Sequence, residues 1–266
     1  MNDILSRLRE NRPLIHCIVG PVASNFCANG ALAIGARPIM AEHPLESAEI
    51  TASANGLLLN MSGLTDGKMQ AMTASAQIAA ERSIPMVIDA VGVACSGLRK
   101  RFVLKLMDKA LPAVLKGNYS EIYALYDEQY SSSGVDSDKS IDEKSVQKAA
   151  VALAKRYKTT VLASGKTDII TDGSRVLKIK NGVAQLGSIT ATGCLLGTVC
   201  ACLASAEKPL LAAQYACALL GICGEKAETP KGSGSFMCGL LDALSHISDT
   251  DIVENIKMEE DYFEKA

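Results

Sequence analysis

Residues 56–89, GLLLNMSGLTDGKMQAMTASAQIAAERSIPMVID, contain two short apolar runs that flank a segment with a different periodicity. The runs cover residues 56–60 and 85–89 and have the length of buried strands. Between them, Met69, Met72, Ala76 and Ala79 recur at the spacing of one helix face. Continuous apolar strands separated by helices are typical of a parallel sheet that is buried on both faces. We therefore predict an α/β fold.

The same pattern extends in both directions along the chain. Further strands are expected at residues 14–19, 37–41, 113–116 and 159–163, with a helix at about 22–34 that Gly35 ends. The runs 168–171 and 176–179 are joined around Asp172-Gly173, which is a hairpin signal. A second turn is expected at Asn181-Gly182. The C-terminal part of the sheet is therefore predicted to be antiparallel.

The rest of the chain is expected to be mainly helical. The helices cover about 146–157, 193–206, 209–228 and 233–246, and the apolar stretch 210–224 predicts a buried helix. The segment 131–145 is rich in Ser and Asp and is expected to be an exposed loop, while the acidic tail is expected to be helical or frayed. No change in composition marks a boundary, so we expect a single domain over residues 1–266.

The composition excludes several classes of function. The 266 residues carry a net charge of −2 and are 48% hydrophobic, which argues against disorder and against nucleic-acid or membrane partners. Residues 1–10 lack the apolar core of a secretory signal, so the nine cysteines are expected to be free thiols in a reducing cytoplasm. Three dispersed histidines and the absence of paired cysteines at zinc spacing exclude a zinc site.

Polar residues follow several of the predicted strands. Ligands of open α/β sheets bind beyond the carboxyl ends of the strands, so these residues mark the expected site. They are Asn25, Asn60, Asp89, Asn118, Glu121 and the turn 190–194.

The segment 188–194, SITATGC, precedes an apolar helix and is the strongest individual signal. Small residues at a helix start let backbone N–H groups point at an anion, and the helix dipole adds to this attraction. A capped helix start without a ligand remains the alternative. Cys194 lies in the first turn, where a helix N-terminus lowers the pKa of a thiol. Either it contacts the substrate or acts as a base, or it is a small buried side chain.

Two segments suit a phosphate and its metal ion. Asp89 ends one strand, and Lys116 and Glu121 lie on either side of the turn between the next strand and its helix. The carboxylates of Asp89 and Glu121 are suitable ligands for Mg²⁺, and the ammonium group of Lys116 is suitable for binding phosphate. Helix capping is the alternative for Asp89, and a capping box of Asn118 with Glu121 is compatible with a metal role. Ser164 at a strand end is a nucleotide contact or part of a simple turn; the segment 163–167 is not a Walker A motif, since position 160 is Thr.

Together these segments resemble the hydroxyethylthiazole kinases, a family of the ribokinase-like superfamily. The resemblance runs from Pro13 to Phe236. Its specific pieces, in order, are SNFCANG at 24–30, LAIGARPIM at 32–40, DAVG at 89–92, KGNYSEI at 116–122 and TATGC at 190–194.

The resemblance implies a fold and an activity. The fold is a ribokinase-like three-layer sandwich with a mostly parallel central sheet, helices on both faces and an antiparallel C-terminal portion. The activity is the ATP-dependent, Mg²⁺-requiring phosphorylation of the hydroxyethyl group of 4-methyl-5-(2-hydroxyethyl)thiazole, a salvage step of thiamine biosynthesis. The implied assembly is a homotrimer with its sites at subunit interfaces.

The resemblance also assigns roles to residues. Substrate contacts are expected from Met40, Asn25 and Ala191, ATP contacts from Lys116 and Ser164, Mg²⁺ contacts from Asp89 and Glu121, and catalytic roles from Thr192, Gly193 and Cys194. Cys194 stands where most ribokinase-like relatives have a catalytic Asp. Because phosphoryl transfer needs little help from a base, we expect Cys194→Ala to keep measurable activity.

The sequence departs from the family pattern at five positions. This chain has Ser24 in place of the family's Thr, Ala90 in place of Pro, Lys116 in place of Arg, Ser164 in place of Thr and Ala191 in place of Gly. Lys lacks the two-pronged phosphate contact of Arg, and the Cβ of Ala191 crowds an anion-binding turn. We expect weaker ATP binding or slower turnover, and a gain in kcat/KM from Lys116→Arg and Ala191→Gly.

Two other functions are compatible with these residues. One is a related kinase for another small alcohol, of the hydroxymethylpyrimidine or pyridoxal type. The other is a ligand-binding homologue with weak or no catalysis, which the residues at 116 and 191 favour. A dehydrogenase is excluded, because no glycine fingerprint follows an early strand.

Overall fold

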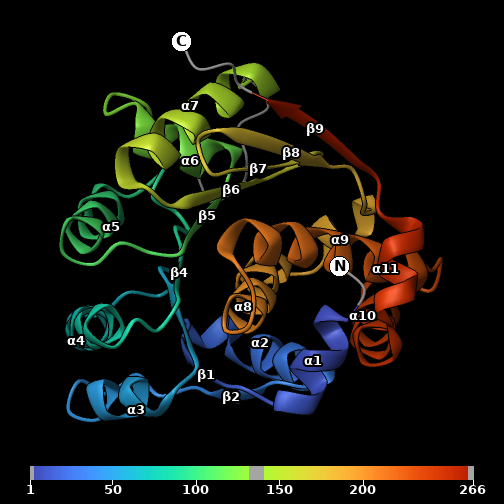
Figure 1. The fold of residues 1–266 in the computed structure, drawn as a ribbon, viewed down its shortest axis with the longest axis horizontal. Coiled ribbons are helices and arrows are strands. Elements are labelled where there is room, and N and C mark those ends of the chain that lie inside the picture. Colours follow the sequence, from blue (N-terminus) through green and yellow to red (C-terminus); the bar gives the residue numbers. More distant parts are fainter. Residues whose placement is uncertain (1–2, 132–140, 263–266) are drawn as a thin grey trace.

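The computed structural model describes residues 3–131 and 141–262 and places one nine-stranded sheet at the centre of the molecule (Figure 1). The strands are β1 (Leu14–Ile18), β2 (Arg37–Ile39), β3 (Gly56–Asn60), β4 (Met86–Asp89), β5 (Val114–Asn118), β6 (Thr160–Ser164), β7 (Asp168–Thr171), β8 (Arg175–Ile179) and β9 (Met258–Tyr262). Their order is β2-β1-β3-β4-β5-β6-β7-β8-β9. Pairing is parallel from β2 to β6 and antiparallel from β6 to β9, as predicted.

Helices cover both faces of the sheet. They are α1 (Ile4–Asn11), α2 (Pro21–Ala33), α3 (Ser47–Ser53), α4 (Asp66–Arg82), α5 (Gly97–Lys109), α6 (Tyr119–Tyr126), α7 (Glu143–Tyr157), the 3₁₀ helix η1 (Ala184–Ser188), α8 (Thr192–Ala204), α9 (Pro209–Ala227), α10 (Ser233–His246) and α11 (Asp249–Asn255). In Figure 1, α3 to α7 lie on one side and α1, α2 and α8 to α11 on the other. The predicted three-layer α/β architecture is thereby confirmed.

Alternate side chains of each central strand enter different cores. In β3, Leu58 packs into the cluster formed with α2, α8 and α9, whereas Leu57 and Leu59 pack into the cluster formed with α4 to α7. Each of these three leucines is 0% exposed. The strand is apolar at every position because successive residues point to opposite faces and both faces are covered.

The predicted buried helix at 210–224 is part of α9, whose central residues are buried. Helix α9 packs against α8 and α10. No described helix combines the length and the apolar character of a membrane span. The helices α1, α3 and α5 were not expected from the sequence, whereas a helix after the turn that follows β5, where α6 begins, was expected. Helix α7 begins at Glu143, and residues 132–140 of the predicted loop lie outside the described residues.

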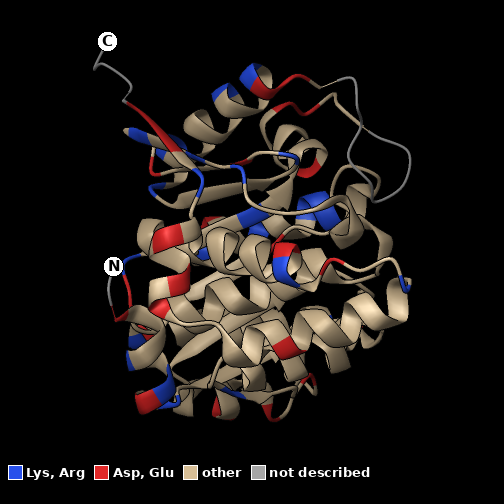
Figure 2. Ribbon diagram, turned by 90° about the vertical axis from the view of Figure 1, so that its right-hand side faces the viewer, with Lys and Arg blue, Asp and Glu red and all other residues tan. Residues whose placement is uncertain are grey.

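The C-terminal region departs from two expectations. The tail is helical in α11, as expected, but residues 258–262 form the strand β9, which pairs antiparallel with β8. Acidic β9 residues face basic β8 residues, with Arg175–Glu260 and Lys178–Asp261 as two of the pairs (Figure 2). Residues 181–182 form no turn; Gly182 has a φ of 130°, and its N–H donates to Glu225.

All nine cysteines are free thiols, as expected. Those buried in the core are Cys17, Cys27, Cys194, Cys200, Cys202, Cys217 and Cys223, while Cys95 and Cys238 are exposed. Cys238 is exposed on α10, unlike the other cysteines of the C-terminal helices, which are buried.

Candidate functional site

Three adjacent parallel strands bring Asn60, Asp89 and Lys116 side by side. Asn60 is opposite Asp89 in the β3–β4 register, and Asp89 is opposite Lys116 in the β4–β5 register. The Asn60 amide donates to Asp89 Oδ2 at 2.7 Å, and Lys116 Nζ donates to Asp89 Oδ1 at 2.9 Å. Asp89 is therefore held from both sides. It does not cap the following helix, since α5 begins at Gly97 with Ser96 as its N-cap.

The Asp89–Lys116 pair is enclosed by protein. Asp89 is 0% exposed and Lys116 is 3% exposed. Burial raises the pKa of Asp89, although the Lys116 charge and the hydrogen bonds from Lys116 and Asn60 oppose this shift. Burial alone would lower the pKa of Lys116, but Asp89 and Glu121 raise it above its ordinary value. Lys116 therefore stays charged and has Asp89 as its counterion.

Glu121 is held at the start of α6 by a capping box with Asn118. The Asn118 side chain accepts from the Glu121 N–H at 2.9 Å, and Glu121 Oε2 accepts from the Asn118 N–H at 2.7 Å. Glu121 Oε1 accepts from the N–H of Gly92 at 2.7 Å. Burial raises the pKa of Glu121, while the charge of Lys116 lowers it. The capping role and the position at the site therefore coexist in one side chain.

The predicted anion-binding turn starts α8. Ala191 is the N-cap and has φ 70° and ψ 8°, a left-handed conformation that a residue with a Cβ rarely adopts. A Cβ added to Gly193 would lie 3.3 Å from Lys116 Nζ, so Gly193 leaves room for the ammonium group. The helix start, with its free N–H groups, thus lies against the buried ion pair.

Cys194 follows in the first turn of α8 and is 9% exposed. Burial, aided by the nearby charge of Asp89, raises its thiol pKa to about 11. The expectation that the helix N-terminus lowers this pKa is therefore wrong, because desolvation is the larger effect. The thiol is neutral at physiological pH.

Two cavities meet at the start of α8. The first, here the Leu220 cavity, has a volume of about 660 Å³; the second, here the Lys116 cavity, has about 620 Å³. Ser164, Gly187, Thr192 and Gly193 line both of them. A ligand that extends from one cavity into the other therefore passes the N-terminus of α8.

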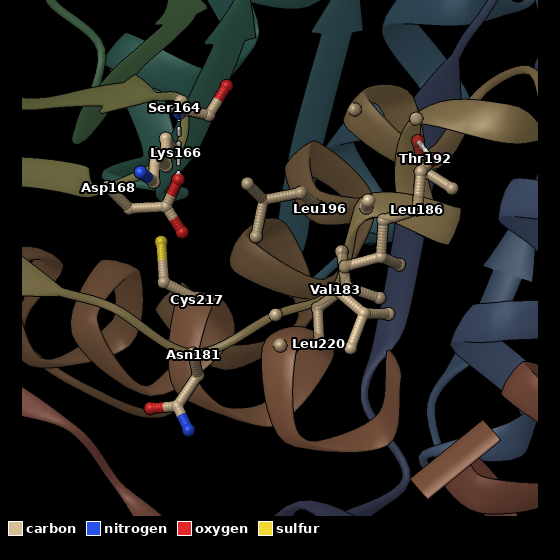
Figure 3. A pocket seen from close by; sticks show the side chains of 16 residues that line it. Ser164, Lys166, Asp168, Asn181, Val183, Leu186, Thr192, Leu196, Cys217 and Leu220 are labelled. Atoms are coloured by element: carbon tan, nitrogen blue, oxygen red, sulfur yellow. Dashed lines mark hydrogen bonds between the residues drawn. The ribbon is translucent and has the colours of Figure 1, made fainter. Parts of the chain in front are cut away.

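The Leu220 cavity has an apolar wall and a polar wall (Figure 3). Val183, Leu186, Leu196 and Leu220 form the apolar wall. Across from them, Asp168 accepts from the N–H of Gly165 at 3.0 Å, and its carboxylate faces Cys217. Burial raises the pKa of Asp168 to about 6. The cavity thus offers an apolar surface that suits a flat apolar group and a hydrogen-bond acceptor, the carboxylate of Asp168.

Most of the predicted site residues lie around these cavities. Lys116, Glu121, Ser164, Ala191, Thr192, Gly193 and Cys194 line the Lys116 cavity, and Asp89 lies behind Lys116. The lining of the two cavities does not include Asn25 or Met40. Asn25 is exposed on α2, where its side chain accepts from Asn29 at 3.2 Å, and Met40 is half-buried after β2. Their substrate contacts stay predictions.

Sequence reasoning missed Arg99, Ser62 and Val22, which also line the Lys116 cavity. Arg99 lies on α5, ten residues after the end of β4, and Val22 is apolar, so neither is among the polar residues that follow a predicted strand. Ser62 lies two residues beyond the end of β3, and its hydroxyl is bonded to Asn60, so the rule that sites follow strand ends contained a signal for this residue.

Comparisons with known proteins show the family to which this chain is related. The model of the hydroxyethylthiazole kinase family matches residues 5–250. Hydroxyethylthiazole kinase 2 of Clostridium botulinum strain Hall is 42% identical, with 96% of this chain and 98% of the relative covered. Hydroxyethylthiazole kinase of Staphylococcus carnosus is 37% identical, with 98% and 99% covered.

Solved structures show the same fold. The hydroxyethylthiazole kinase protein of Pyrococcus horikoshii superposes with a TM-score of 0.89 at 34% identity, with 97% of each chain covered. Pyridoxal kinase of Staphylococcus aureus, solved with ADP, has a TM-score of 0.65 at 13% identity over 94% of this chain and 98% of its own, which shows a shared fold alone. By its sequence and its structure, this chain belongs to the hydroxyethylthiazole kinase family.

Proposed function

We propose that this protein transfers the γ-phosphoryl group of ATP to the hydroxyethyl group of 4-methyl-5-(2-hydroxyethyl)thiazole. Membership of the hydroxyethylthiazole kinase family over residues 5–250 is the observation that carries this proposal. The reaction produces the thiazole phosphate used in thiamine biosynthesis, so the protein serves a salvage step in the cytoplasm.

The two cavities divide the substrates between them. The Leu220 cavity takes the nucleoside, because its apolar wall suits a base and Asp168 offers an acceptor for a hydroxyl group. The phosphates pass Ser164 and the N–H groups of Thr192 and Gly193, which line both cavities. The thiazole alcohol occupies the Lys116 cavity beside Cys194. This arrangement brings the γ-phosphoryl group and the hydroxyl together at the start of α8.

Glu121 lines the Lys116 cavity and suits a magnesium ion that is bound together with ATP, and Asp89, paired with Lys116 behind the cavity wall, is the second carboxylate at this position. The described residues contain no cluster of three or more acidic, Cys or His side chains that would hold a metal alone. Mg²⁺ commonly uses one or two carboxylates and takes its other ligands from water and phosphate, and Asp89 and Glu121 are two such groups. When bound, the ion neutralises phosphate charge, while the chain orients both substrates.

Electrostatic stabilisation at the turn carries the chemistry. In a loose transition state the charge lies on the phosphoryl oxygens, and the N–H groups at the start of α8 and the helix dipole stabilise it. The neutral thiol of Cys194 is a poor base, with a pKa of about 11. Cys194 therefore acts mainly by shaping the space around the alcohol.

The predicted homotrimer completes this proposal. Val22 is 75% exposed although it lines the Lys116 cavity, and Asn25 lies on the same exposed side of α2. Packing of a neighbouring copy against this side would bury Val22 and close the cavity. Light scattering coupled to gel filtration tests the assembly; a monomer at assay concentration that is fully active would contradict a shared site.

An ATP-dependent assay tests the function directly. The protein is incubated with ATP, Mg²⁺ and hydroxyethylthiazole, and in parallel with hydroxymethylpyrimidine and pyridoxal, and the phosphorylated products are quantified. We expect the thiazole to have the highest kcat/KM, Asp89→Asn to be strongly impaired, and the exposed-site control Asp242→Asn to be unaffected. A preference for another alcohol, or thiazole binding without ATP turnover, would contradict the proposal.

A further inference from the structure

Arg99 places a guanidinium group at the Lys116 cavity. It lies in the first turn of α5, lines the cavity and is half-buried. Its Nη1 donates to the carbonyl of Val91 at 3.1 Å. The group lies over Gly92, where any Cβ would collide with Nη1, and the N–H of Gly92 in turn holds Glu121. The guanidinium is therefore held next to the predicted metal-binding carboxylate.

The charge of Arg99 lacks a carboxylate partner within the described residues. Lys116, the other cation lining this cavity, is paired with Asp89 at 2.9 Å. Arg99 forms no ion pair in the described parts of the chain, and its side chain donates to one backbone carbonyl. A guanidinium has five N–H donors, so most of its donors are available to a ligand.

A second cation, Lys68, lies beside the same cavity. Lys68 Nζ donates at 2.8 Å to the carbonyl of Ser62, which lines the same cavity. Burial is the main cause that lowers the pKa of Lys68 to about 8; Glu42 and Cys194 oppose this shift, and the charge of Arg99 makes a smaller contribution in the same direction as burial. The walls of the cavity therefore carry an unneutralised cation, and an anionic ligand would relieve the repulsion.

We propose that Arg99 contacts the phosphoryl group during its transfer, and this inference rests on the proposed kinase function. In that step the bond from the γ-phosphorus to the bridging oxygen of ADP breaks and a bond to the alcohol oxygen forms. The hydroxyl proton passes to water. The equatorial phosphoryl oxygens carry the charge throughout, and two N–H groups of a guanidinium match two of these oxygens. Lys116 differs from Arg99 in having Asp89 as its counterion, so Arg99 adds a second positive group to this cavity.

The experiment compares Arg99→Ala and Arg99→Lys with the control Arg101→Ala, which removes the same charge from an exposed position on the same helix. We expect Arg99→Ala to lower kcat about 10- to 100-fold, as for a charge-assisted hydrogen bond, with little change in the KM for the alcohol. Arg99→Lys should be intermediate and Arg101→Ala unchanged.

A binding measurement separates contact with the phosphoryl group from a structural role. Aluminium fluoride with MgADP and the alcohol mimics the transferring group, so it should tighten ADP binding in the parent protein. In Arg99→Ala, the factor by which aluminium fluoride increases the affinity for ADP should be at least tenfold smaller than in the parent protein. The affinity for MgADP alone should be unchanged. Arg99→Gln, which keeps a donor for Val91 without the charge, should behave like Arg99→Ala and serves in its place if that variant does not fold.

A purely structural role of Arg99 would give a different set of results and would overturn the inference. If Arg99 only holds the loop around Gly92 and thereby Glu121, Arg99→Ala will need more Mg²⁺ for half-maximal activity and will keep the full aluminium fluoride effect at saturating Mg²⁺. Wild-type-like activity of Arg99→Ala would also overturn it. A parent protein that phosphorylates a different alcohol contradicts the proposed substrate only, because the same comparison is then made with that alcohol.

Discussion

Ala191 holds a strained backbone conformation at the point where both cavities meet. Its φ of 70° costs a residue with a Cβ about 1 kcal/mol relative to Gly. We expect Ala191→Gly to raise the free energy of unfolding by up to about 1 kcal/mol, since the greater freedom of Gly in the unfolded chain offsets part of the gain. We also expect a higher kcat/KM for ATP, because the Cβ no longer crowds the turn.

Ser83→Gly is the matched control for this change. Ser83 has a φ of 56° at the C-terminus of α4 and does not line either cavity. Urea unfolding should show a similar gain in stability for both variants, and only Ala191→Gly should change the kinetics. Equal kinetics for parent and Ala191→Gly would show that the Cβ does not impede the phosphates.

The structure alters the expectation for Lys116→Arg. The family resemblance predicts a gain in kcat/KM, but Lys116 is 3% exposed, with its Nζ close to Asp89 and to the backbone at Gly193. Arg is larger, and overpacking an enclosed position typically costs 1–3 kcal/mol. We therefore expect lower stability in urea unfolding and no gain in kcat/KM; an active variant of unchanged stability would show that the cavity accommodates the larger group.

Cys194→Ala tests whether the thiol acts as a base. Because burial holds the thiol neutral, we expect the variant to lose less activity than the roughly 100-fold attributed to a positioned general base. Cys200→Ala, a buried thiol further along α8, is the control for packing. Complete loss of activity with intact fold and substrate binding would contradict this view. Cys194→Asp then shows whether a stronger base accelerates transfer.

Some residues of the site can be predicted from the sequence alone, and others cannot. Asp89 and Glu121 follow strands, and the rule that ligands bind at strand ends identifies them without the structure. The sequence leaves open whether Cys194 is a buried, neutral thiol, because its burial depends on β3, β4 and α8 together. Arg99 is hidden in the sequence, since a helical arginine is usually a solvated surface residue and only the three-dimensional fold places it at the cavity.

Strand β9 shows how one element depends on another. Its residues pair with β8 over the whole length of both strands, and Lys180–Glu259 adds to the ion pairs between them. We expect deletion of residues 258–266 to lower the free energy of unfolding by about 2–3 kcal/mol, mostly through the lost ladder hydrogen bonds. It should also promote aggregation, because β8 becomes an edge strand.

A double variant provides the control for this deletion. Glu259→Gln with Glu260→Gln keeps the strand and removes two of its charges. Exposed ion pairs contribute little, so this variant should lose less than about 1 kcal/mol. Urea unfolding and light scattering measure both effects; equal losses in the deletion and the double variant would assign the stability to the charges and not to the ladder.

Element prediction succeeds where the signal is local. The continuous apolar runs of β3 and β4 and the period of α4 are sufficient to identify these elements. The segment 258–262 has no apolar alternation, and it becomes a strand because β8 offers a basic edge about 80 residues earlier in the chain. Hydrophobic periodicity within one segment does not detect such charge complementarity between two segments that are distant in the chain.

Asp249 joins the first helix to the last part of the chain. Its carboxylate accepts from the N–H of Leu5 at 2.8 Å and from the hydroxyl of Ser6 at 2.7 Å, and the hydroxyl of Tyr215 on α9 also donates to it. We expect Asp249→Asn to lower the free energy of unfolding at pH 7 by roughly 2–3 kcal/mol, because the amide cannot accept all these bonds. The exposed control Asp242→Asn should be neutral.

The effect of Asp249→Asn should depend on pH. Burial alone would raise the pKa of Asp249, but the hydrogen bonds from Tyr215, Ser6 and Leu5 lower it below its ordinary value. A lowered pKa in the folded state means that the carboxylate stabilises the protein fully above the unfolded value of about 3.9. The difference between parent and variant in urea unfolding should therefore be constant above about pH 5 and shrink below pH 4. A difference that grows on acidification would contradict this assignment.

The positions of the exposed thiols allow a fluorescent label to be attached to this protein at a chosen cysteine. Seven cysteines are enclosed, so a maleimide dye added to the folded protein reaches Cys95 and Cys238 first. Cys95 lies in the loop that connects β4 to α5, and its Sγ donates to the carbonyl of Gly92 at 3.4 Å. With Cys238 replaced by Ser, a single fluorophore would report from the loop around Gly92, over which the Arg99 guanidinium lies, so the arrival and departure of phosphates could be followed in real time without a coupled enzyme.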